Sequence, residues 1–113
     1  MDVFECAPDG NKLQTERDAI ELIGEALSRH ATLVLLPVER LADDFFRLRS
    51  GIAGAVIQKF VTYRLRLAIV GDISGHVAAS AAFRDFVIEA NRGHRVWFLE
   101  TREELSQRLA MLH

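Results

Sequence analysis

Side chains that could do chemistry gather in one short stretch of the chain, "DDFFRLRS", residues 43 to 50. Its adjacent carboxylates, Asp43 and Asp44, are of the type that serves as general acid or base and as ligand of hard metal ions. Its arginines, Arg47 and Arg49, could hold a small anion, because guanidinium groups match carboxylate and phosphate. Adjacent side chains seldom aim at one point, so a solvated acidic pair at a helix start stays open as the alternative.

Phe45 and Phe46 lie in the middle of this stretch. Phenylalanine more often anchors a loop to the core than contacts a ligand. Since two neighbouring side chains do not easily both face inward, we expect at least one ring to be exposed. Phe45 is kept as a candidate interaction residue.

Ser50 ends the stretch and precedes an apolar, helix-like run. Serine is a preferred N-cap, and a cap for a helix over residues 51–63 is one interpretation. A helix N-terminus beside Arg47 and Arg49 also suits a phosphate. The "GIAG" that follows lacks both glycine-rich phosphate-loop patterns.

A further acid, Asp72, closes the run "LAIVGD". A carboxylate at a strand end can bind a metal or act in catalysis, and it can equally cap the next loop. His76 is nearby, but no second histidine stands at zinc-ligand spacing. No catalytic Ser-His-Asp or Cys-His set is recognisable, and Cys6 has the setting of a half-buried strand residue. We therefore expect no metal, no cofactor and no catalytic residue.

Length and composition limit the class of protein. A chain of 113 residues, half of them hydrophobic, fits one ordinary globular domain. The formal net charge of −2 disfavours a dedicated nucleic-acid binder. No apolar run reaches the length of a membrane span, and the first residues lack the pattern of a signal peptide. A cytoplasmic location is expected.

Buried strands alternate with amphipathic helices, which predicts an α/β domain with a mostly parallel sheet of four or five strands covered by four helices. The expected order is strand, strand, helix, strand, helix, strand, helix, strand, helix. Glycine at 93 predicts a left-handed end for the third helix. The expected strands are residues 3–6, 12–14, 32–36, 65–70 and 95–99, and the helices are 15–29, 51–63, 78–91 and one that begins with the capping box Thr101–Glu104.

Two helix faces have a defined composition. In the helix over 15–29, Ala19, Ile20, Ile23 and Leu27 form the predicted core stripe. The helix over 51–63 has a small, flat face that would let another chain approach closely. That face consists of Gly54, Ala55, Gln58 and Thr62.

Ligands of open α/β sheets gather beyond the carboxyl ends of the strands. The predicted topology puts the loops 37–50, 71–77 and 100–101 there. If Asp44, Arg47 and Asp72 converge in an enclosed pocket, a small enzyme or ligand-binding protein is favoured. If they point apart into solvent, the enzyme interpretation fails.

Two segments carry a resemblance to a known family. "DFFRLRSGIAGAVIQKFVTYRLRLAIVGD" (Asp44 to Asp72) and "FRDFVIEANRG" (Phe83 to Gly93) resemble the bacterial domain-of-unknown-function family 4180. That family shows a similar Asp-Phe-Phe-x-Leu, Gly-x-Ala-Gly, Ile-Val-Gly-Asp and Glu-x-Asn-Arg/Lys-Gly. The resemblance implies no particular activity.

The element order is also similar to that of STAS-like domains, the fold of anti-sigma factor antagonists. In those domains a Ser or Thr at the start of a helix can be phosphorylated to switch partner binding, and Ser50-Gly51 stands at the comparable place. Arg49 stands where that turn has an acid.

Two functions follow as hypotheses. The favoured one is a non-enzymatic regulatory or protein-interaction module whose partner is another protein or a second copy in a homodimer, with no nucleic acid and no membrane. The alternative is a small enzyme or ligand-binding protein with a polar site at the strand carboxyl ends, holding a small anionic ligand through Arg47 and Arg49.

Overall fold

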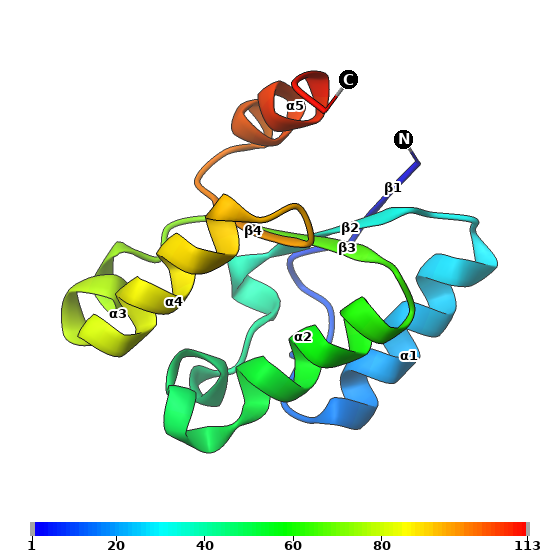
Figure 1. Ribbon diagram of the computed structural model, residues 1–113. Helices are drawn as coiled ribbons and strands as arrows, with labels where there is room; N and C mark the ends of the chain where they lie inside the picture. The colour runs from blue at the N-terminus through cyan, green and yellow to red at the C-terminus, as the bar shows by residue number, and fades with distance from the viewer. Residues whose placement is uncertain (1, 113) are drawn as a thin grey trace.

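The computed structural model describes residues 2–112, and its centre is a four-stranded sheet in which every neighbouring pair of strands is parallel (Figure 1). The spatial order of the strands is the same as their order in the chain. The α/β class and the parallel sheet are therefore confirmed, with four strands. They are β1 (Val3–Glu5), β2 (Leu33–Pro37), β3 (Arg66–Val70) and β4 (Val96–Leu99).

Within residues 2–112, five α-helices and three short 3₁₀ turns connect and cover these strands. The turns, η1 (Val38–Arg40), η2 (Asp43–Phe46) and η3 (Leu48–Ser50), follow one another between β2 and the next helix. The α-helices are α1 (Glu16–Ser28), α2 (Ile52–Thr62), α3 (Ser74–Ala79), α4 (Ala81–Arg92) and α5 (Arg102–Ala110).

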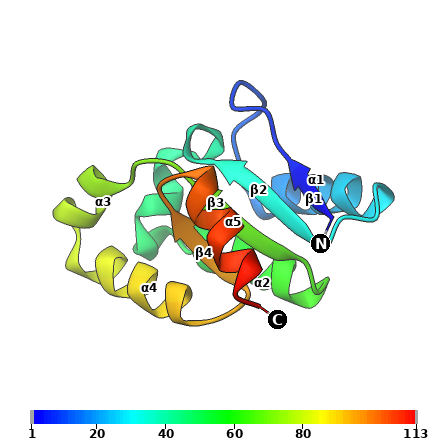
Figure 2. The same cartoon turned by 90° about the horizontal axis from the view of Figure 1, so that it is seen from above.

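The strand order decides where the helices lie. A connection between parallel strands is almost always right-handed. When each connection also moves one strand in the same direction, every crossover helix must fall on the same face of the sheet. Figures 1 and 2 show this arrangement, with α1, α2 and α4 on one face and only the C-terminal α5 on the other.

The two faces of the sheet accordingly carry two cores, because alternate strand residues point to opposite sides. Beneath the crossover helices, Val34, Leu67 and Phe98 belong to the larger cluster. On the other face, Trp97 and its neighbours pack against Leu105 of α5. Arg108 of α5 lies over the Trp97 ring, 4.7 Å from its centroid, and helps to hold α5 on this face.

Threonine side chains cap the starts of α1 and α5, and at Thr15 the cap is a reciprocal capping box. The capping box predicted at Thr101–Glu104 is half formed, because the Glu104 carboxylate accepts from Glu100 N, at 3.1 Å, and not from Thr101 N. The Thr15 hydroxyl accepts a hydrogen bond from Asp18 N at 3.2 Å, and Thr15 N donates to the Asp18 carboxylate at 3.0 Å. The Thr101 hydroxyl accepts from Glu104 N at 3.2 Å. Each cap satisfies backbone donors that a helix start leaves free.

The turns from α1 into β2 and from α2 into β3 are built alike. In each, the residue after the helix cap is left-handed, His30 with φ 60° and Arg64 with φ 56°. The next amide bonds back into the helix, Ala31 N to Ala26 O at 3.0 Å and Leu65 N to Phe60 O. This is the Schellman motif, in which glycine or asparagine usually takes the left-handed position.

Three expected elements differ from the structure. Residues 12–14 form no sheet strand, and Leu13 makes one isolated parallel bridge with Leu41. The stretch predicted as a loop at 73–77 is the start of α3, and Ser80 separates α3 from α4 because its hydroxyl caps Phe83 N at 3.1 Å. Gly93 ends α4 in an extended conformation, with φ −88° and ψ −167°.

The core stripe predicted for α1 was wrong for two of its four residues. Ala19 and Ile23 are buried, but Ile20 and Leu27 are 43% and 41% exposed. Leu22 and Ala26 take the inward positions instead. The small face predicted for α2 lies outward, with Gly54, Gln58 and Thr62 exposed and Ala55 partly so.

We expect Phe83→Ala to lower the free energy of unfolding by about 3–5 kcal/mol, as truncation of buried aromatics usually does. Phe83 is fully buried and its ring contacts those of Phe46 and Phe98. Urea denaturation followed by circular dichroism measures the change. On the same helix, Ile88 is 44% exposed, so Ile88→Ala should stay within about 0.5 kcal/mol of wild type. Equal losses in both variants would contradict the packing described.

Candidate functional site

The stretch predicted to be chemically active, residues 43–50, is largely packed into the core. Phe45 is fully buried and Phe46 is 7% exposed, so the expectation of an exposed ring was wrong. The Phe45 ring reaches Phe98 of the sheet, with centroids 6.5 Å apart, while Phe46 stacks on His76 at 3.7 Å. Both rings are buried because the η2 turn lies between the sheet and α3. Phe45 packs against the sheet, and Phe46 packs on the opposite side against α3.

The polar residues of this stretch stabilise its own turns. Asp44 pairs with Arg47, and both side chains are more than half exposed. The Ser50 hydroxyl donates to Asp44 O at 2.6 Å and accepts from Ile52 N at 3.2 Å. Gly51, with φ 78°, takes the N-cap position of α2 that was predicted for Ser50, because the chain needs a left-handed residue between η3 and the helix.

Asp43 and Arg49 are exposed, and Asp43 lines an open depression of about 400 Å³ together with Asp44 and Arg47. Asp72 is not among the residues that line it. The structure therefore pairs Asp44 with Arg47, and Asp72 does not line the depression that they share.

Asp72 closes the turn that leads into α3, directly before the N-cap Ile73. Its carboxylate accepts a hydrogen bond from Ser74 N at 2.9 Å. The Ser74 hydroxyl and backbone amide hold the pKa of Asp72 below its usual value. The cap interpretation of this residue thus accounts for its geometry.

The carboxyl edge of the sheet is closely packed where β3 ends beside η1. A side chain at position 71 would meet the Val38 side chain at 2.8 Å, so only glycine fits against η1. The rule that places ligands at the carboxyl ends depends on a point where the strand order reverses and neighbouring loops part. The order β1-β2-β3-β4 has no reversal, and the segment 38–50 packs where a crevice was expected.

Other reactive candidates also have structural roles. Burial raises the pKa of the Cys6 thiol to about 11, so the thiol stays protonated. Lys59 of α2 pairs with Glu16 of α1 at 3.0 Å.

Asn91 protects the free edge of β4. Leu67 N and Gly71 N bond to Arg95 O and Leu99 O. Backbone groups of neighbouring strand residues alternate in direction, so those of Phe98 face away from β3. The Asn91 side chain accepts from Phe98 N at 2.7 Å and donates to Phe98 O at 3.1 Å. One side-chain amide thereby replaces a neighbouring strand, which blunts an aggregation-prone edge.

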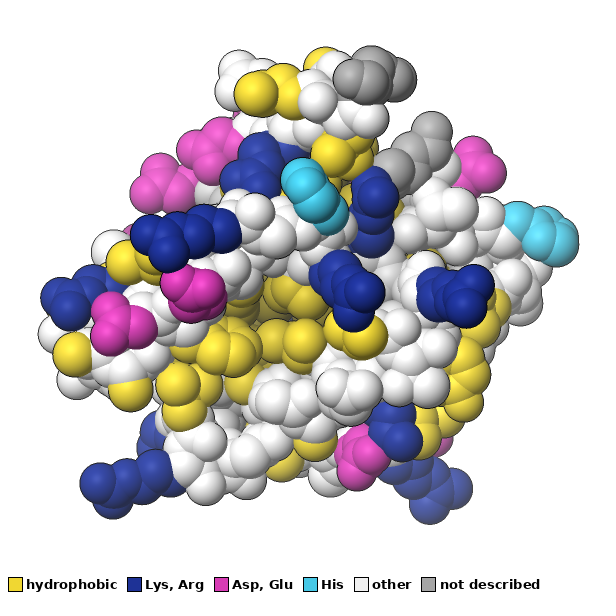
Figure 3. Space-filling view, viewed as in Figure 1, with side chains coloured by type: hydrophobic (Ala, Val, Ile, Leu, Met, Phe, Trp, Pro, Cys, Tyr) yellow, Lys and Arg dark blue, Asp and Glu magenta, His cyan; other side chains and the backbone are white. Residues whose placement is uncertain are grey.

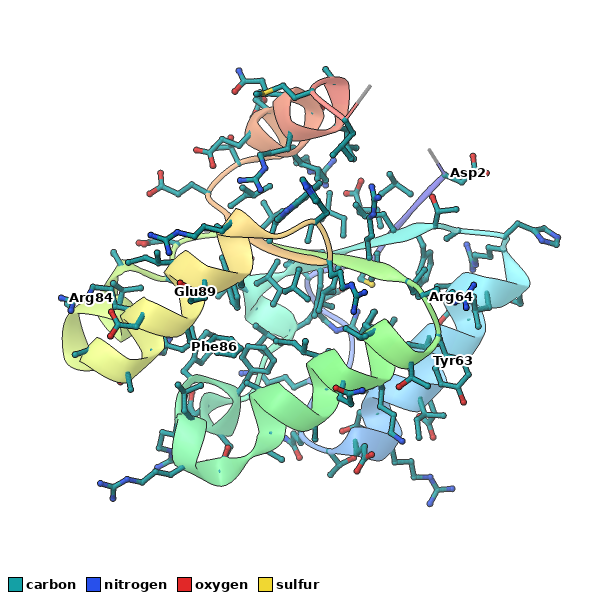
Figure 4. All side chains as sticks on the ribbon, in the orientation of Figure 1. Asp2, Tyr63, Arg64, Arg84, Phe86 and Glu89 are labelled. Carbon is teal, nitrogen blue, oxygen red and sulfur yellow. The ribbon has the colours of Figure 1, made fainter. Side chains whose placement is uncertain are left out.

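An apolar groove opens on the helix-covered face, between α2 and α4. Ile57 and Val61 line it from α2, Phe86 and Ala90 from α4, and Val96 from β4, around a volume of about 470 Å³. Figure 3 shows the yellow hollow between these helices, and Figure 4 shows Phe86 reaching into the space between them. The groove exists because α2 packs against α1, whereas α4 packs against β4 and α3.

A basic hollow of about 580 Å³ continues the groove at the amino ends of β3 and β4. Val61, His94 and Arg95 line both spaces. Arg64 and Arg66 line only the hollow. Dark blue side chains stand above the yellow hollow in Figure 3.

Two short sequence segments could have predicted the basic hollow. "YRLR" and "GHR" each precede a strand and place four basic residues just before or at the strand starts. The amino ends of parallel strands lie at one edge, so these residues had to come together.

Residues 2–112 contain no group of three His, Cys, Asp or Glu side chains placed to hold a metal ion. None of the helices in that range has both the length and the apolar character to cross a membrane.

The fold defines an α/β protein with a sequential parallel sheet, and the site defines a groove that is apolar along its length and basic at one end. A family model described as "Domain of unknown function (DUF4180)" matches residues 1–109, and the chain belongs to that family. No curated protein and no solved structure matches the chain.

We expect Ser50→Ala to cost about 1 kcal/mol of unfolding free energy, since it removes the hydroxyl that bridges Asp44 O and Ile52 N. Ser50→Asp should cost at least as much, because the carboxylate accepts from Ile52 N but cannot donate to Asp44 O. Phosphorylation of Ser50, which stays a prediction, would have the same effect on the turn. Thermal and urea unfolding measure both variants.

The exposed Ser106 of α5 serves as the control, and Ser106→Ala should leave stability within about 0.5 kcal/mol of wild type. A Ser50→Asp variant as stable as wild type would contradict the bridging role of the hydroxyl.

Asn91→Ala should lower the free energy of unfolding by about 1–3 kcal/mol, because the Phe98 amide and carbonyl lose their partner. It should also increase concentration-dependent association, since the β4 edge becomes free to pair. Urea denaturation and light scattering test the two effects. Asn91→Asp keeps an acceptor for Phe98 N but places a carboxylate beside Phe98 O, so it should not restore wild-type stability. Full stability of Asn91→Asp would refute the two-bond arrangement.

Proposed function

We propose that this chain is a non-catalytic binding module whose ligand site is the groove between α2 and α4. The observation that carries the proposal is the groove itself, with apolar walls from two helices and a β4 side chain at its base. Its volume of about 470 Å³ falls in the range of small-molecule pockets, which are mostly apolar with a few polar groups. The expected occupant is a small organic molecule with an apolar body.

The chemistry of the lining residues supports binding rather than catalysis. The groove and its basic end include one acid, Glu89, and one imidazole, His94, with no hydroxyl or thiol side chain. The Glu89 carboxylate pairs with Arg92 at 2.8 Å. A nucleophile activated by a neighbouring base is the usual arrangement for covalent catalysis, and these residues do not supply one.

The regulatory role implied by the STAS-like resemblance is compatible with such a site. A ligand that contacts both α2 and α4 would favour one spacing of the two helices over others, and a partner could sense that spacing. The exposed face of α2, around Gly54 and Gln58, offers a surface for a partner protein or for a second copy.

The neutral fluorescent probe N-phenyl-1-naphthylamine tests the groove. We expect saturable binding with one site per chain. Ala90→Trp, which fills the groove from α4, should weaken it at least tenfold. Ile88→Trp adds the same side chain at a position of α4 that is 44% exposed and should bind as wild type. Val61→Trp, from the α2 wall, repeats the block independently of α4.

Circular dichroism and urea denaturation establish that each variant is folded. Failure of the probe to bind, or equal binding by all three variants, would overturn the groove as the ligand site. Probe binding that rises with a dimer fraction in light scattering would indicate that a second copy forms the site, which also contradicts the proposal.

A further inference from the structure

We infer that the ligand of the groove is an amphipathic organic anion, with its apolar body between α2 and α4 and its carboxylate or phosphate held by Arg64 and Arg95. This inference rests on the proposed function. It goes further by naming the chemical class of the ligand and the residues that select it.

Three arginines at the hollow lie outside the ion pairs of the chain. Among residues 2–112, ion pairs involve seven of the 14 basic residues, and Arg64, Arg66 and Arg95 are not among them. Arginines without carboxylate partners thus gather at one hollow of a protein with a net negative charge. A basic hollow of this kind attracts anions.

The apolar groove and the basic hollow are continuous. Because Val61, His94 and Arg95 line both the apolar groove and the basic hollow, one molecule can occupy both. A guanidinium group binds carboxylate and phosphate through paired, charge-assisted hydrogen bonds. The apolar walls exclude water from the rest of the ligand, and burial of its apolar surface adds to the affinity.

The arginines of the hollow are not equivalent. Arg66 lines only the hollow, and its Nη1 atom is buried without a hydrogen-bond partner among the described residues. Arg95 lines both the hollow and the apolar groove. Arg64 lies in the turn after α2, at the end of the helix that forms one wall (Figure 4). Arg64 and Arg95 are therefore assigned to the head group.

The acid in the lining does not oppose this assignment. Glu89 lies on the apolar part of the groove and is neutralised by Arg92. It is absent from the residues that line the basic hollow, so the head group and Glu89 occupy different ends of the site.

The backbone of Arg64 makes a clean experiment available. Arg64 is left-handed, with φ 56°, and glycine adopts this conformation without strain. Arg64→Gly therefore removes the charge without loss of fold. His30 has the same backbone geometry, with φ 60°, in the equivalent turn after α1. His30→Gly is the matched control, because it makes the same backbone change away from the groove.

Isothermal titration calorimetry with decanoate, decyl phosphate and 1-decanol measures the affinity of the protein for each ligand. Each ligand is used below the concentration at which it aggregates. Decanoate or decyl phosphate should bind the wild-type protein at least tenfold more tightly than 1-decanol. Arg64→Gly and Arg95→Ala should each weaken the anions about three- to tenfold and leave 1-decanol unchanged. His30→Gly should bind all three as wild type. The tighter-binding anion of the two shows whether the site prefers a carboxylate or a phosphate head group.

The outcomes distinguish the two proposals. If 1-decanol binds as tightly as the anions, the groove stands and the anion inference fails. If Arg64→Gly weakens anions and alcohol equally, the arginine does not act through charge and the inference also fails. If none of the three probes binds, the proposed groove site itself is refuted, and an acidic peptide becomes the next occupant to test.

Discussion

The constraint on which the rest of this structure depends is the combination of sequential strand order with right-handed crossovers. Because each connection advances one strand in the same direction, α1, α2 and α4 must share one face. The opposite face would be bare, and α5 covers it through Leu105 and the Arg108–Trp97 stacking. Arg108 also donates to Asn91 O at 2.6 Å. The last helix is thus tied to the same residue that closes the edge of β4.

The same constraint explains why the candidate site is not at the carboxyl ends of the strands. A sheet without a reversal of strand order has no crevice where loops at the carboxyl ends part. Here the segment 38–50 fills that edge with Phe45 and Phe46. Open space remains between α2 and α4, in the layer of helices that connect the strands. The β3-to-β4 connection contains two helices, and α4 packs with α3 and β4 rather than with α2. The groove is the gap that results, and it opens toward the amino ends of the strands.

Much of the fold could be predicted from local sequence because its signals are local. The apolar run Thr32–Leu36, the helix over 15–29 and the cap at Thr101 correspond to elements that the structure contains. The predictions of side-chain burial that were wrong share one cause. Whether Ile20 or Leu22 faces inward, and whether Phe45 and Phe46 can both be buried, depends on what packs against them. The groove could not be predicted, because it depends on the spacing between α2 and α4. The sequence of neither helix alone determines that spacing.

The position of the groove also determines how rigidly a ligand would be held. Its basic end is formed where α2 turns into β3 and where α4 turns into β4. The first turn is fixed by the Leu65 N to Phe60 O bond of the Schellman motif. The second is fixed by Asn91 on Phe98 and by the Trp97 indole on Gly93 O at 2.8 Å. Arg64 and Arg95 therefore lie in turns that hydrogen bonds hold in place, while the apolar walls belong to two helices that pack mainly against different neighbours. Such a site has a pre-organised charged end and an adjustable apolar end. This division suits a ligand whose head group is constant and whose apolar body varies, because ordering the protein around the head group costs little.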